Sequence, residues 1–324
     1  MVRLRRSSPS DAGWTRRRAG TGFTYLDARG ERLGEEERAR VKALVIPPAW
    51  EDVWICPFPN GHLQAVGTDA AGRRQYLYHP DWRIRRDAEK FQRVRSFGRA
   101  LPKARERVLT DLARDGVPVE RACATAVRLM DLGYFRIGND VYADENGSFG
   151  LTTLEPRHVR RRQGNLLFEF TGKSGIEHSV EIDDPLVVDA VAAMRRRRAA
   201  EGPLLAWKNG RRWRPLDPGT VNDYVREVTG CEATAKDFRT WHATVLAAAA
   251  LAASKEPGKT TASRKRAVAA AMREVGEYLG NTATIARNSY VDPAVIDAYE
   301  EGRTIRLSDD PAALERATLR LLRG

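Results

Sequence analysis

The sequence is poor in cysteine, and the three cysteines that it contains cannot form a framework. Cys56, Cys123 and Cys231 lie far apart, and their odd number argues against paired disulfides and for a reducing compartment, the cytoplasm. None of their spacings matches a zinc-binding motif. We therefore expect neither disulfide staples nor a structural metal site.

Long apolar runs are also absent. The most apolar stretch, Val245–Ala253, is nine residues long and mostly alanine, whereas a membrane-spanning helix needs about 20 residues. Residues 1–6 carry positive charge, but no apolar segment follows them, so no signal peptide is visible. We expect a cytoplasmic protein with no membrane partner.

Lysine is scarce, although the chain is strongly basic. Its 324 residues include 46 Arg and 9 Lys against 43 Asp and Glu, which gives a net charge of +12 and a pI near 9.9. This balance favours a polyanionic partner, most simply double-stranded DNA; the plainer alternative is a basic protein with a solvated face. Residues 1–90 carry +5 and residues 91–324 carry +7, as two domains that grip one duplex would need.

Residues 1–90 have the pattern of a small α+β domain. Residues 1–20, rich in Arg, Ser and Gly, are expected to form a mobile basic arm. Residues 34–47 begin with acids and continue with bases, which predicts a helix that stops at the following prolines. Four short β-prone segments separated by turn residues predict an antiparallel sheet: Gly22–Leu26, Val53–Cys56, Leu63–Gly67 and Arg74–Tyr78.

The last of these strands carries the candidate DNA-binding residues Gln75, Tyr76 and Tyr78. Alternation along a strand places Tyr76 and Tyr78 on one face of the sheet. Tyrosines in such positions are usually half-buried packing residues, but in a basic domain they and the glutamine can also reach phosphates and base edges. The two roles are compatible.

Residues 91–324 have the pattern of a larger, mostly α domain. The Arg-rich segment from about residue 81 to 114 is helical in pattern, and Pro102 marks either a bend or the join of two helices. Further helices are predicted from periodicity and capping residues over residues 119–132, 189–199, 217–228, 236–253, 266–279 and 311–322. The chain is therefore predicted to be an α+β protein of two domains.

A hairpin is predicted where two β-prone segments, residues 166–171 and 176–182, flank Gly172–Gly175. The Gly-Lys-Ser sequence at its tip invites comparison with the phosphate-binding loop of nucleotide-binding proteins. That loop requires a glycine at the position of Leu167 and a helix after the tip, where this chain has a strand. We therefore expect that no nucleotide binds here.

The stretch Gly280–Pro293 contains Tyr290, the candidate nucleophile. A phenol has an ordinary pKa near 10, so a catalytic tyrosine needs nearby cations to stabilise its phenolate. Arg287 lies three residues away. The structural alternative is that Tyr290 closes one helix while Asp292 caps the next. Other segments of the chain favour the catalytic interpretation.

Five residues could together form a phosphoryl-transfer site without a metal: Arg136, Lys173, Arg239, Asn281 and Tyr290. Two arginines can each fork onto phosphate oxygens and stabilise a five-coordinate transition state. A lysine differs from them because it can release a proton, so Lys173 suits the role of general acid toward a leaving alkoxide. The plainer alternative for Lys173 is a solvated turn residue.

Four of these segments occur in a fixed order along the chain: Phe135–Asn139, Gly172-Lys173, Lys236–Thr240 and Asn281–Tyr290. In that order they resemble the type IB DNA topoisomerases, specifically the compact poxvirus-like branch found in bacteria. The strand Gln75–Tyr78 also resembles the DNA-contacting strand of that branch. The resemblance covers the chain from about residue 21 to 300, and the ordered set is more specific than any single motif.

The resemblance implies a catalytic domain of the type shared by type IB topoisomerases and tyrosine recombinases, with a small β-sheet. Tyr290 would attack a phosphate of duplex DNA to form a 3′-phosphotyrosyl bond, the nicked duplex would rotate, and the strand would be religated. Arg136 and Arg239 would bind nonbridging oxygens, while Lys173 would protonate the leaving 5′ oxygen. Asn281 stands where many relatives carry histidine, and it can donate a hydrogen bond but carry no charge.

The same resemblance implies a monomeric, nucleoid-associated enzyme that uses no cofactor, nucleotide or metal. Two alternatives stay open. A tyrosine recombinase uses much the same catalytic set, but it usually has histidine three residues before the second arginine; here that residue is Lys236, and His242 follows Arg239. A noncatalytic architectural DNA-binding protein would account for the charge and the aromatic residues but not for the ordered catalytic set.

Overall fold

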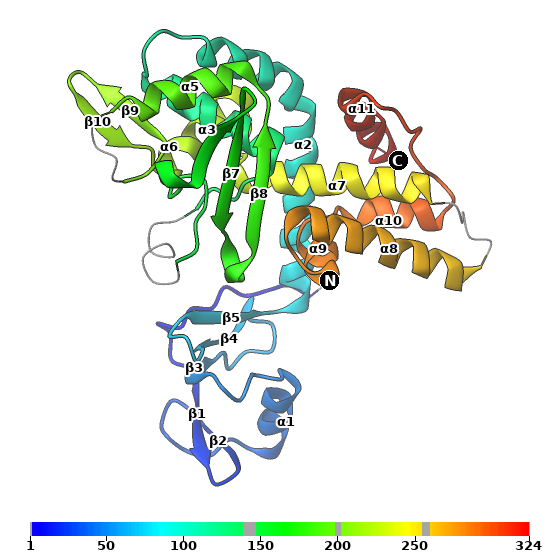
Figure 1. Ribbon diagram of the computed structural model, residues 1–324. Coiled ribbons are helices and arrows are strands. Elements are labelled where there is room, and N and C mark those ends of the chain that lie inside the picture. Colours follow the sequence, from blue (N-terminus) through cyan, green and yellow to red (C-terminus); the bar gives the residue numbers. More distant parts are fainter. Residues whose placement is uncertain (1, 139–146, 198–201, 255–259, 324) are drawn as a thin grey trace. The chain divides into compact units, whose positions relative to one another are not determined.

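Two units with separate apolar cores make up the chain, Met1–Lys90 and Phe91–Gly324 (Figure 1). The computed structural model describes residues 2–138, 147–197, 202–254 and 260–323. The first core contains Trp14 and the second contains Trp241. Each unit therefore buries an apolar core of its own, as an independent domain does.

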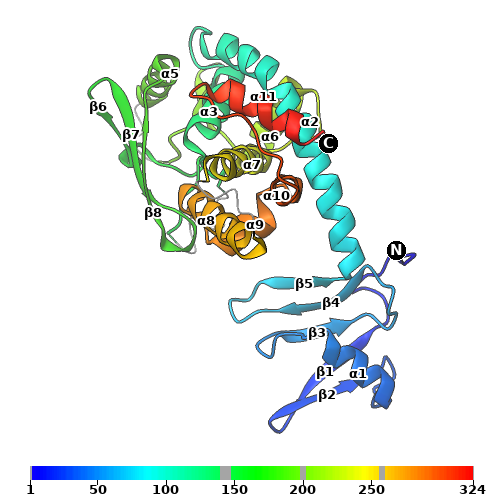
Figure 2. The same cartoon turned by 90° about the vertical axis from the view of Figure 1, so that its right-hand side faces the viewer.

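The first unit is built on an antiparallel sheet. Its strands are β1 (Trp14–Ala19), β2 (Gly22–Leu26), β3 (Glu51–Ile55), β4 (Leu63–Thr68) and β5 (Arg74–Tyr78). They lie in the order β2-β1-β3-β4-β5 (Figure 2). Helix α1 (Glu35–Ala43) has three acidic residues in its first turn, which suits the positive end of the helix dipole. Its Val41 packs with Val53 in the core of this unit.

The expectation of a mobile arm over residues 1–20 is wrong. Strand β1 pairs with both β2 and β3, so that Thr15 lies opposite Leu26 on one side and Trp54 on the other. Trp14 is only 8% exposed. Burial of a tryptophan and pairing on both edges outweigh the arginine-rich composition of the segment.

Helix α2 (Pro80–Leu112) begins in the first unit and continues into the second. Pro102 lies inside this helix, which runs on through it, so the alternative of two joined helices is wrong. Leu101 and Val108 on either side of the proline are buried. Tertiary packing of this apolar face supports the helix where the proline removes a backbone hydrogen bond.

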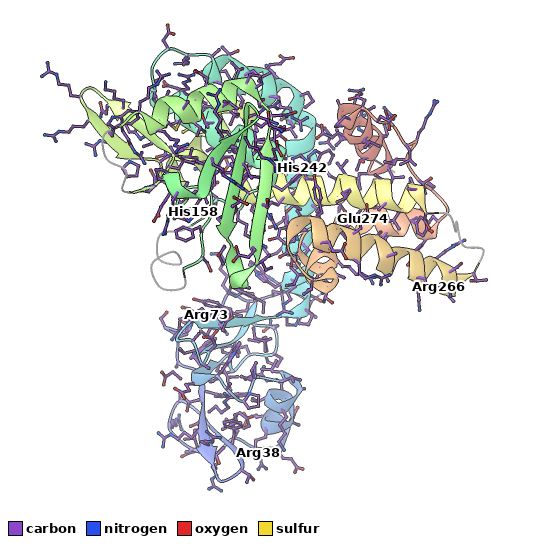
Figure 3. The ribbon with its side chains drawn as sticks, in the orientation of Figure 1. Arg38, Arg73, His158, His242, Arg266 and Glu274 are labelled. Atoms are coloured by element: carbon purple, nitrogen blue, oxygen red, sulfur yellow. The ribbon has the colours of Figure 1, made fainter. Side chains whose placement is uncertain are left out.

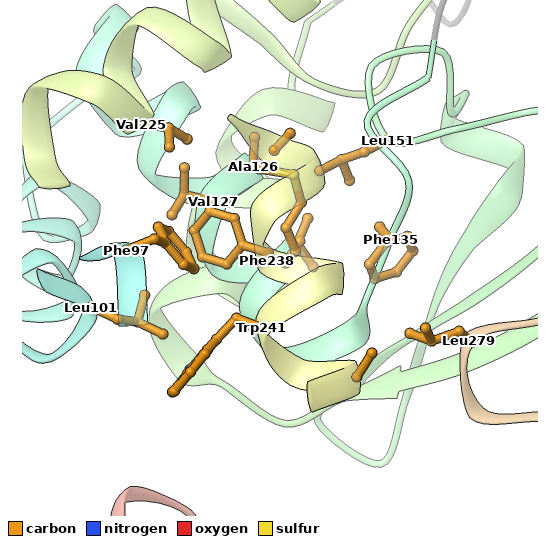
Figure 4. Close-up of a cluster of buried hydrophobic side chains, with 14 of the residues drawn as sticks. Phe97, Leu101, Ala126, Val127, Phe135, Leu151, Val225, Phe238, Trp241 and Leu279 are labelled. Atoms are coloured by element: carbon orange, nitrogen blue, oxygen red, sulfur yellow. The ribbon is translucent and has the colours of Figure 1, made fainter. Parts of the chain in front are cut away.

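The second unit is mostly helical, as predicted. Its remaining helices are α3 (Val119–Gly133), α5 (Pro185–Arg195), α6 (Pro218–Thr229), α7 (Ala235–Ala253), α8 (Thr261–Leu279), α9 (Ala283–Ser289), α10 (Pro293–Glu300) and α11 (Pro311–Leu321). Helix α7 runs through the centre, where Phe238 and Trp241 are buried (Figure 4). A methyl group on Gly98 of α2 would lie 2.8 Å from the Trp241 ring. Glycine there lets the two helices approach closely.

A three-stranded antiparallel sheet also belongs to this unit. Its strands β6 (Val159–Arg162), β7 (Asn165–Thr171) and β8 (Glu177–Ile182) lie in that order, and a separate hairpin joins β9 (Ala206–Asn209) to β10 (Arg212–Pro215). The β7–β8 hairpin was predicted, whereas β6, β9 and β10 were not. Helix α5 also begins earlier than predicted, because the Asp184 side chain caps it and Pro185 takes its first position. The α+β fold class is confirmed.

Candidate active site

Tyr290 lies at the junction of α9 and α10. Its backbone N–H donates to Ala286 O at 3.0 Å and closes α9, while its carbonyl accepts from Thr244 Oγ1 at 3.3 Å. Asp292 caps α10 by accepting from the backbone N–H of Ala294 at 3.1 Å. The structural role foreseen for this segment is therefore real, and it holds the backbone of Tyr290 in place while the half-buried phenol faces a cleft.

The capping aspartate is itself anchored from another helix. Arg95 of α2 donates to both carboxylate oxygens of Asp292, at 2.8 and 3.1 Å. Asp292 is 1% exposed, so this bidentate pair is largely shielded from water and its geometry is well defined. The turn that carries Tyr290 is thus fixed to the core of the unit.

Arg239 of α7 lies beside the phenol and is almost fully buried. Its guanidinium carbon is 5.4 Å from the centre of the Tyr290 ring. The two terminal nitrogens donate to backbone carbonyls, at 2.5 Å to Tyr134 and 2.6 Å to Leu279, while Nε has no partner among the described residues. A buried donor without a partner is rare in proteins, and this one belongs to the guanidinium beside the Tyr290 ring.

Burial, and then the positive charge of Arg136, lower the pKa of Arg239 to about 10 against the opposing effect of Tyr290. The guanidinium still carries its charge at neutral pH. For Tyr290, burial by itself would raise the pKa. The charges of Arg239 and Arg136, and then of Lys236, outweigh burial, so the pKa of the phenol lies below its ordinary value. The site therefore favours the phenolate.

Arg136 forms a hydrogen bond with Asn281, which is far from it in sequence. Arg136 follows the end of α3, and its Nη2 donates to Asn281 Oδ1 at 2.9 Å and to Gly280 O at 3.1 Å. The backbone N–H of Asn281 donates to Gly276 O at 2.7 Å. Asn281 thus holds Arg136 by a hydrogen bond to a neutral side chain, so this partner does not neutralise the positive charge of Arg136.

Lys173 occupies the tip of the β7–β8 hairpin and is exposed. In both views the hairpin tip lies beside α8 and α9 (Figures 1 and 2). Lys173, Arg136, Asn281 and Tyr290 line one cleft of about 740 Å³. Arg239 is not among the residues that line this cleft, but it lies next to the Tyr290 ring and lines a second, small cavity with Arg136. All five candidate catalytic residues are therefore brought together.

Most charged side chains that line the cleft are cations. Lys236 is one that was not predicted from the sequence. It lies three residues before Arg239 on α7, a spacing that puts the two side chains on one face of a helix and could have revealed it. Arg287, the cation nearest to Tyr290 in sequence, is exposed and lies outside the lining of the cleft. Helical spacing was thus a better guide than proximity in sequence.

The backbone carbonyl that orients Arg239 belongs to a strained residue. Tyr134 caps the end of α3 with φ 56° and ψ 27°, a left-handed conformation that costs a non-glycine residue about 1 kcal/mol. Its ring meets those of His242 and Tyr278 edge-on, with centroid distances of 4.8 and 4.5 Å. These contacts hold Tyr134 where its carbonyl can accept from Arg239.

A chain of buried charges supports this arrangement. His242, in the first half of α7 (Figure 3), lies with Nε2 3.1 Å from Asp131 Oδ1. Arg105 donates to both oxygens of Asp131 at 2.8 and 2.9 Å, and to both oxygens of Glu315 on α11 at 2.7 and 2.9 Å. Burial alone would raise the pKa of Asp131, but the bonds from His242 and Arg105 hold it well below its usual range. The C-terminal helix is thereby linked to the support of Tyr134.

The candidate DNA-binding residues lie on β5 of the first unit. Tyr76 and Tyr78 lie on one face, as predicted, with nearly parallel rings 6.2 Å apart, and Tyr76 is 48% exposed. Gln75 donates from Nε2 to Asp69 Oδ2 at 2.8 Å. Tyr76 is therefore accessible to a ligand, whereas the Gln75 side chain is held by a carboxylate.

Neither a metal-ligand cluster nor a membrane-spanning helix is present in the part of the chain that the structure describes. Over that part, no three His, Cys, Asp or Glu side chains gather where they could hold a metal ion. None of the helices described is long and apolar enough to cross a membrane.

Two family models match the chain. That of the eukaryotic DNA topoisomerase I catalytic core matches residues 79–307, and that of the bacterial DNA topoisomerase IB N-terminal domain matches residues 22–69. The first match covers well over half of the chain and includes all five candidate catalytic residues. Gln75, Tyr76 and Tyr78 fall between the two matched ranges.

Individual relatives agree with these matches. DNA topoisomerase 1B of Acanthamoeba polyphaga mimivirus is 28% identical over 300 residues, which is 89% of this chain and 88% of the viral protein. DNA topoisomerase 1 of Schizosaccharomyces pombe is 28% identical over 159 residues, 48% of this chain and 18% of the yeast protein. DNA topoisomerase 1B of vaccinia virus (strain Copenhagen) is 18% identical over 272 residues, 80% of this chain and 77% of the viral protein.

Proposed function

The chain belongs to the type IB DNA topoisomerases, and from that membership we propose that Tyr290 is the nucleophile that cleaves one strand of double-stranded DNA. The phenolate oxygen attacks a backbone phosphorus and forms a 3′-phosphotyrosyl bond. The bond from phosphorus to the 5′ oxygen breaks, and that oxygen takes a proton. After the nicked duplex rotates, the 5′ hydroxyl attacks the phosphotyrosine and restores the strand.

The observation that carries this proposal is the position of Arg239 beside Tyr290, with the guanidinium carbon 5.4 Å from the ring centre. The buried charge favours the phenolate before attack. During attack, Arg239 and Arg136 donate to nonbridging oxygens of the five-coordinate phosphorus. Preorganised donors of this kind are strong stabilisers of developing charge.

Lys173 is the proposed general acid. It lines the same cleft as Tyr290 and Arg136, so a phosphate held by the arginine is within reach of the hairpin tip. An ammonium can give its proton to the leaving 5′ oxygen, which a guanidinium does not do at ordinary pH. Asn281 takes part by holding Arg136 and by offering its own amide to the phosphate.

The reaction needs neither ATP nor a divalent metal, because the phosphotyrosyl bond conserves the energy of the phosphodiester and torsion in the DNA drives rotation. All of the proposed catalytic residues come from one chain, which supports action as a monomer. We assign Gln75, Tyr76 and Tyr78 to contacts with the duplex. An enzyme that acts on duplex DNA in this way is expected to be associated with the nucleoid.

The test is relaxation of supercoiled plasmid by purified protein with a chelator and without nucleotide. Supercoils of both signs should relax, and a covalent protein–DNA adduct should be trapped on denaturation. Tyr290→Phe should bind DNA and form no adduct, whereas the matched variant Tyr25→Phe, in the other unit, should behave as wild type. Strict dependence on magnesium or ATP, or an adduct with Tyr290→Phe, would contradict the proposal.

A further inference from the structure

His178 lies close to the proposed catalytic residues, yet the mechanism above gives it no role. It is on β8 opposite Phe170 of β7, and the two rings stack with centroids 5.1 Å apart. Phe170 in turn stacks on Phe135 at 5.7 Å. Phe135 is the residue before Arg136, so the histidine ring ends a stack that begins beside a phosphate-binding arginine.

The ring of His178 occupies space that a side chain at either of two glycines would need. A methyl group on Gly172 would lie 2.6 Å from His178 Nε2 and Cδ2, and a methyl group on Gly280 would lie 3.0 Å from its Cε1. Gly172 directly precedes Lys173, and Gly280 directly precedes Asn281. The ring therefore packs between the backbone next to the general acid and the backbone next to the asparagine.

The surroundings of the ring favour its neutral form. His178 lines a small cavity together with Arg136 and Arg239. Burial lowers the pKa of the imidazole, and the positive charges of the two arginines lower it further. A neutral ring fills the space between the hairpin and the turn after α8 without adding another cation to a site already rich in them.

We infer that His178 is a positioning residue for Lys173. Its ring acts as a spacer that sets how far the β7–β8 hairpin tip stands from the Gly280 turn, and hence how far the ammonium stands from the phosphate held by Arg136. The inference rests on the proposed function of Lys173. A displacement of about 1 Å can slow an enzyme on the order of 100-fold, so a spacer affects cleavage without touching the substrate.

The test is single-turnover cleavage of two duplexes that differ only in the scissile 5′ atom, oxygen or sulfur. His178→Ala should slow cleavage of the oxygen substrate about 10- to 100-fold and lose most of this defect on the sulfur substrate, because a thiolate leaves without a proton. Lys173→Ala should behave likewise, and the double variant should be no slower than Lys173→Ala. Equal slowing on both substrates, or defects that multiply in the double variant, would overturn the inference.

Gly172→Ala gives a second test that keeps the histidine. The backbone there has φ −95°, which alanine adopts readily, so only the new methyl group and the ring compete for space. The variant should cleave the oxygen substrate slowly, and its cleavage rate should recover on the sulfur substrate. Adding His178→Ala removes the clash, so the pair should be no slower than His178→Ala alone. A pair slower than both single variants would contradict the spacer role.

His158→Ala is the matched control. His158 is another half-buried histidine of this unit, packed on Phe149 at 4.3 Å, and it lines neither of the two cavities described above. It should cleave both substrates at the wild-type rate, and a defect rescued by sulfur there would overturn the inference. A wild-type protein that forms no adduct refutes the proposed function itself. A wild-type protein that cleaves while His178→Ala matches it refutes the spacer role alone.

Discussion

At the scale of single residues, the proposed role of Tyr290 requires a weakly acidic phenol to act as a nucleophile near neutral pH. Burial of Tyr290 opposes its ionisation, and three cations outweigh burial. Arg239 is the most effective of them because it is buried itself, and the interaction between charges strengthens as water is excluded. Its backbone partners fix its position before any phosphate binds.

Cleavage by Lys173→Ala should be about 10²- to 10⁴-fold slower than by wild type, the usual range for a missing proton donor. Replacing the scissile 5′ oxygen by sulfur should restore much of the rate, because the leaving thiolate needs no proton. Arg136→Ala and Arg239→Ala should recover less, since sulfur leaves the nonbridging oxygens in place. If Lys173→Ala is equally slow on both substrates, another residue supplies the proton.

The pKa of Tyr290 is lowered in the folded protein, so phenolate forms as pH rises and its formation should be complete at a lower pH than for a free phenol, near 10. Lys236→Ala removes one of the lowering charges and should move this pKa upward. Ultraviolet titration of each protein against the same protein carrying Tyr290→Phe isolates the phenol. Arg287→Ala, which removes an exposed cation outside the cleft, should leave the titration unchanged, and an equal shift in both variants would contradict the assignment.

At the scale of secondary-structure elements, the site is assembled from side chains that separate elements contribute. The β7–β8 hairpin brings Lys173, the α9–α10 junction brings Tyr290, and α7 brings Arg239. Helix α11 contributes no residue to the cleft lining, yet its Glu315 closes the charge chain behind Tyr134. The C-terminal helix is therefore part of the structure that orients the site.

Glu315→Ala should lower the free energy of unfolding by about 3 kcal/mol, because it leaves part of the Arg105 charge buried without its partner. Glu315 is 6% exposed and meets Arg105 at 2.7 Å. Urea unfolding followed by circular dichroism measures the change. The matched control is Glu301→Ala, which breaks an exposed pair with Arg303, also at 2.7 Å; it should cost less than about 1 kcal/mol. Similar losses in both variants would show that burial is not the deciding factor.

At the scale of the whole molecule, charge and catalysis are distributed differently between the two units. The five proposed catalytic residues lie in residues 91–324, whereas net positive charge is divided as +5 and +7 between the first unit and the second. Each unit has its own apolar core. We propose that the first unit is a DNA-binding module joined to a catalytic one.

Removal of residues 1–90 should weaken duplex binding and reduce its dependence on salt. Each phosphate that the shortened protein no longer neutralises should lower the slope of log affinity against log salt by about one. Filter binding or fluorescence anisotropy over a range of salt concentrations measures both effects against the full chain. A truncated protein with weaker affinity but an unchanged slope would show that the first unit binds no phosphates.

Elements whose patterns are local could be predicted from the sequence. Helical periodicity, capping residues and turn signals predicted most helices, the first sheet and the β7–β8 hairpin. The ordered motifs also identified the five residues that the structure brings to one site. Where local patterns failed, the cause was tertiary. Residues 1–20 look unstructured by composition, but Trp14 is buried in the core of the first unit and β1 pairs with both β2 and β3.

The sequence placed Arg136 and Arg239 in the site, but only the folded chain shows that their charges act on the phenol. Arg287 is close to Tyr290 in sequence but exposed to solvent, while Arg239 and Arg136, distant in sequence, set its ionisation. Two other features have no local pattern in the sequence: the position of His178 between two glycines, and the link from Glu315 to Tyr134. Each depends on side chains from separate elements that meet in the folded chain. Short-range patterns determine elements, whereas electrostatics and packing depend on distances that only the tertiary structure creates.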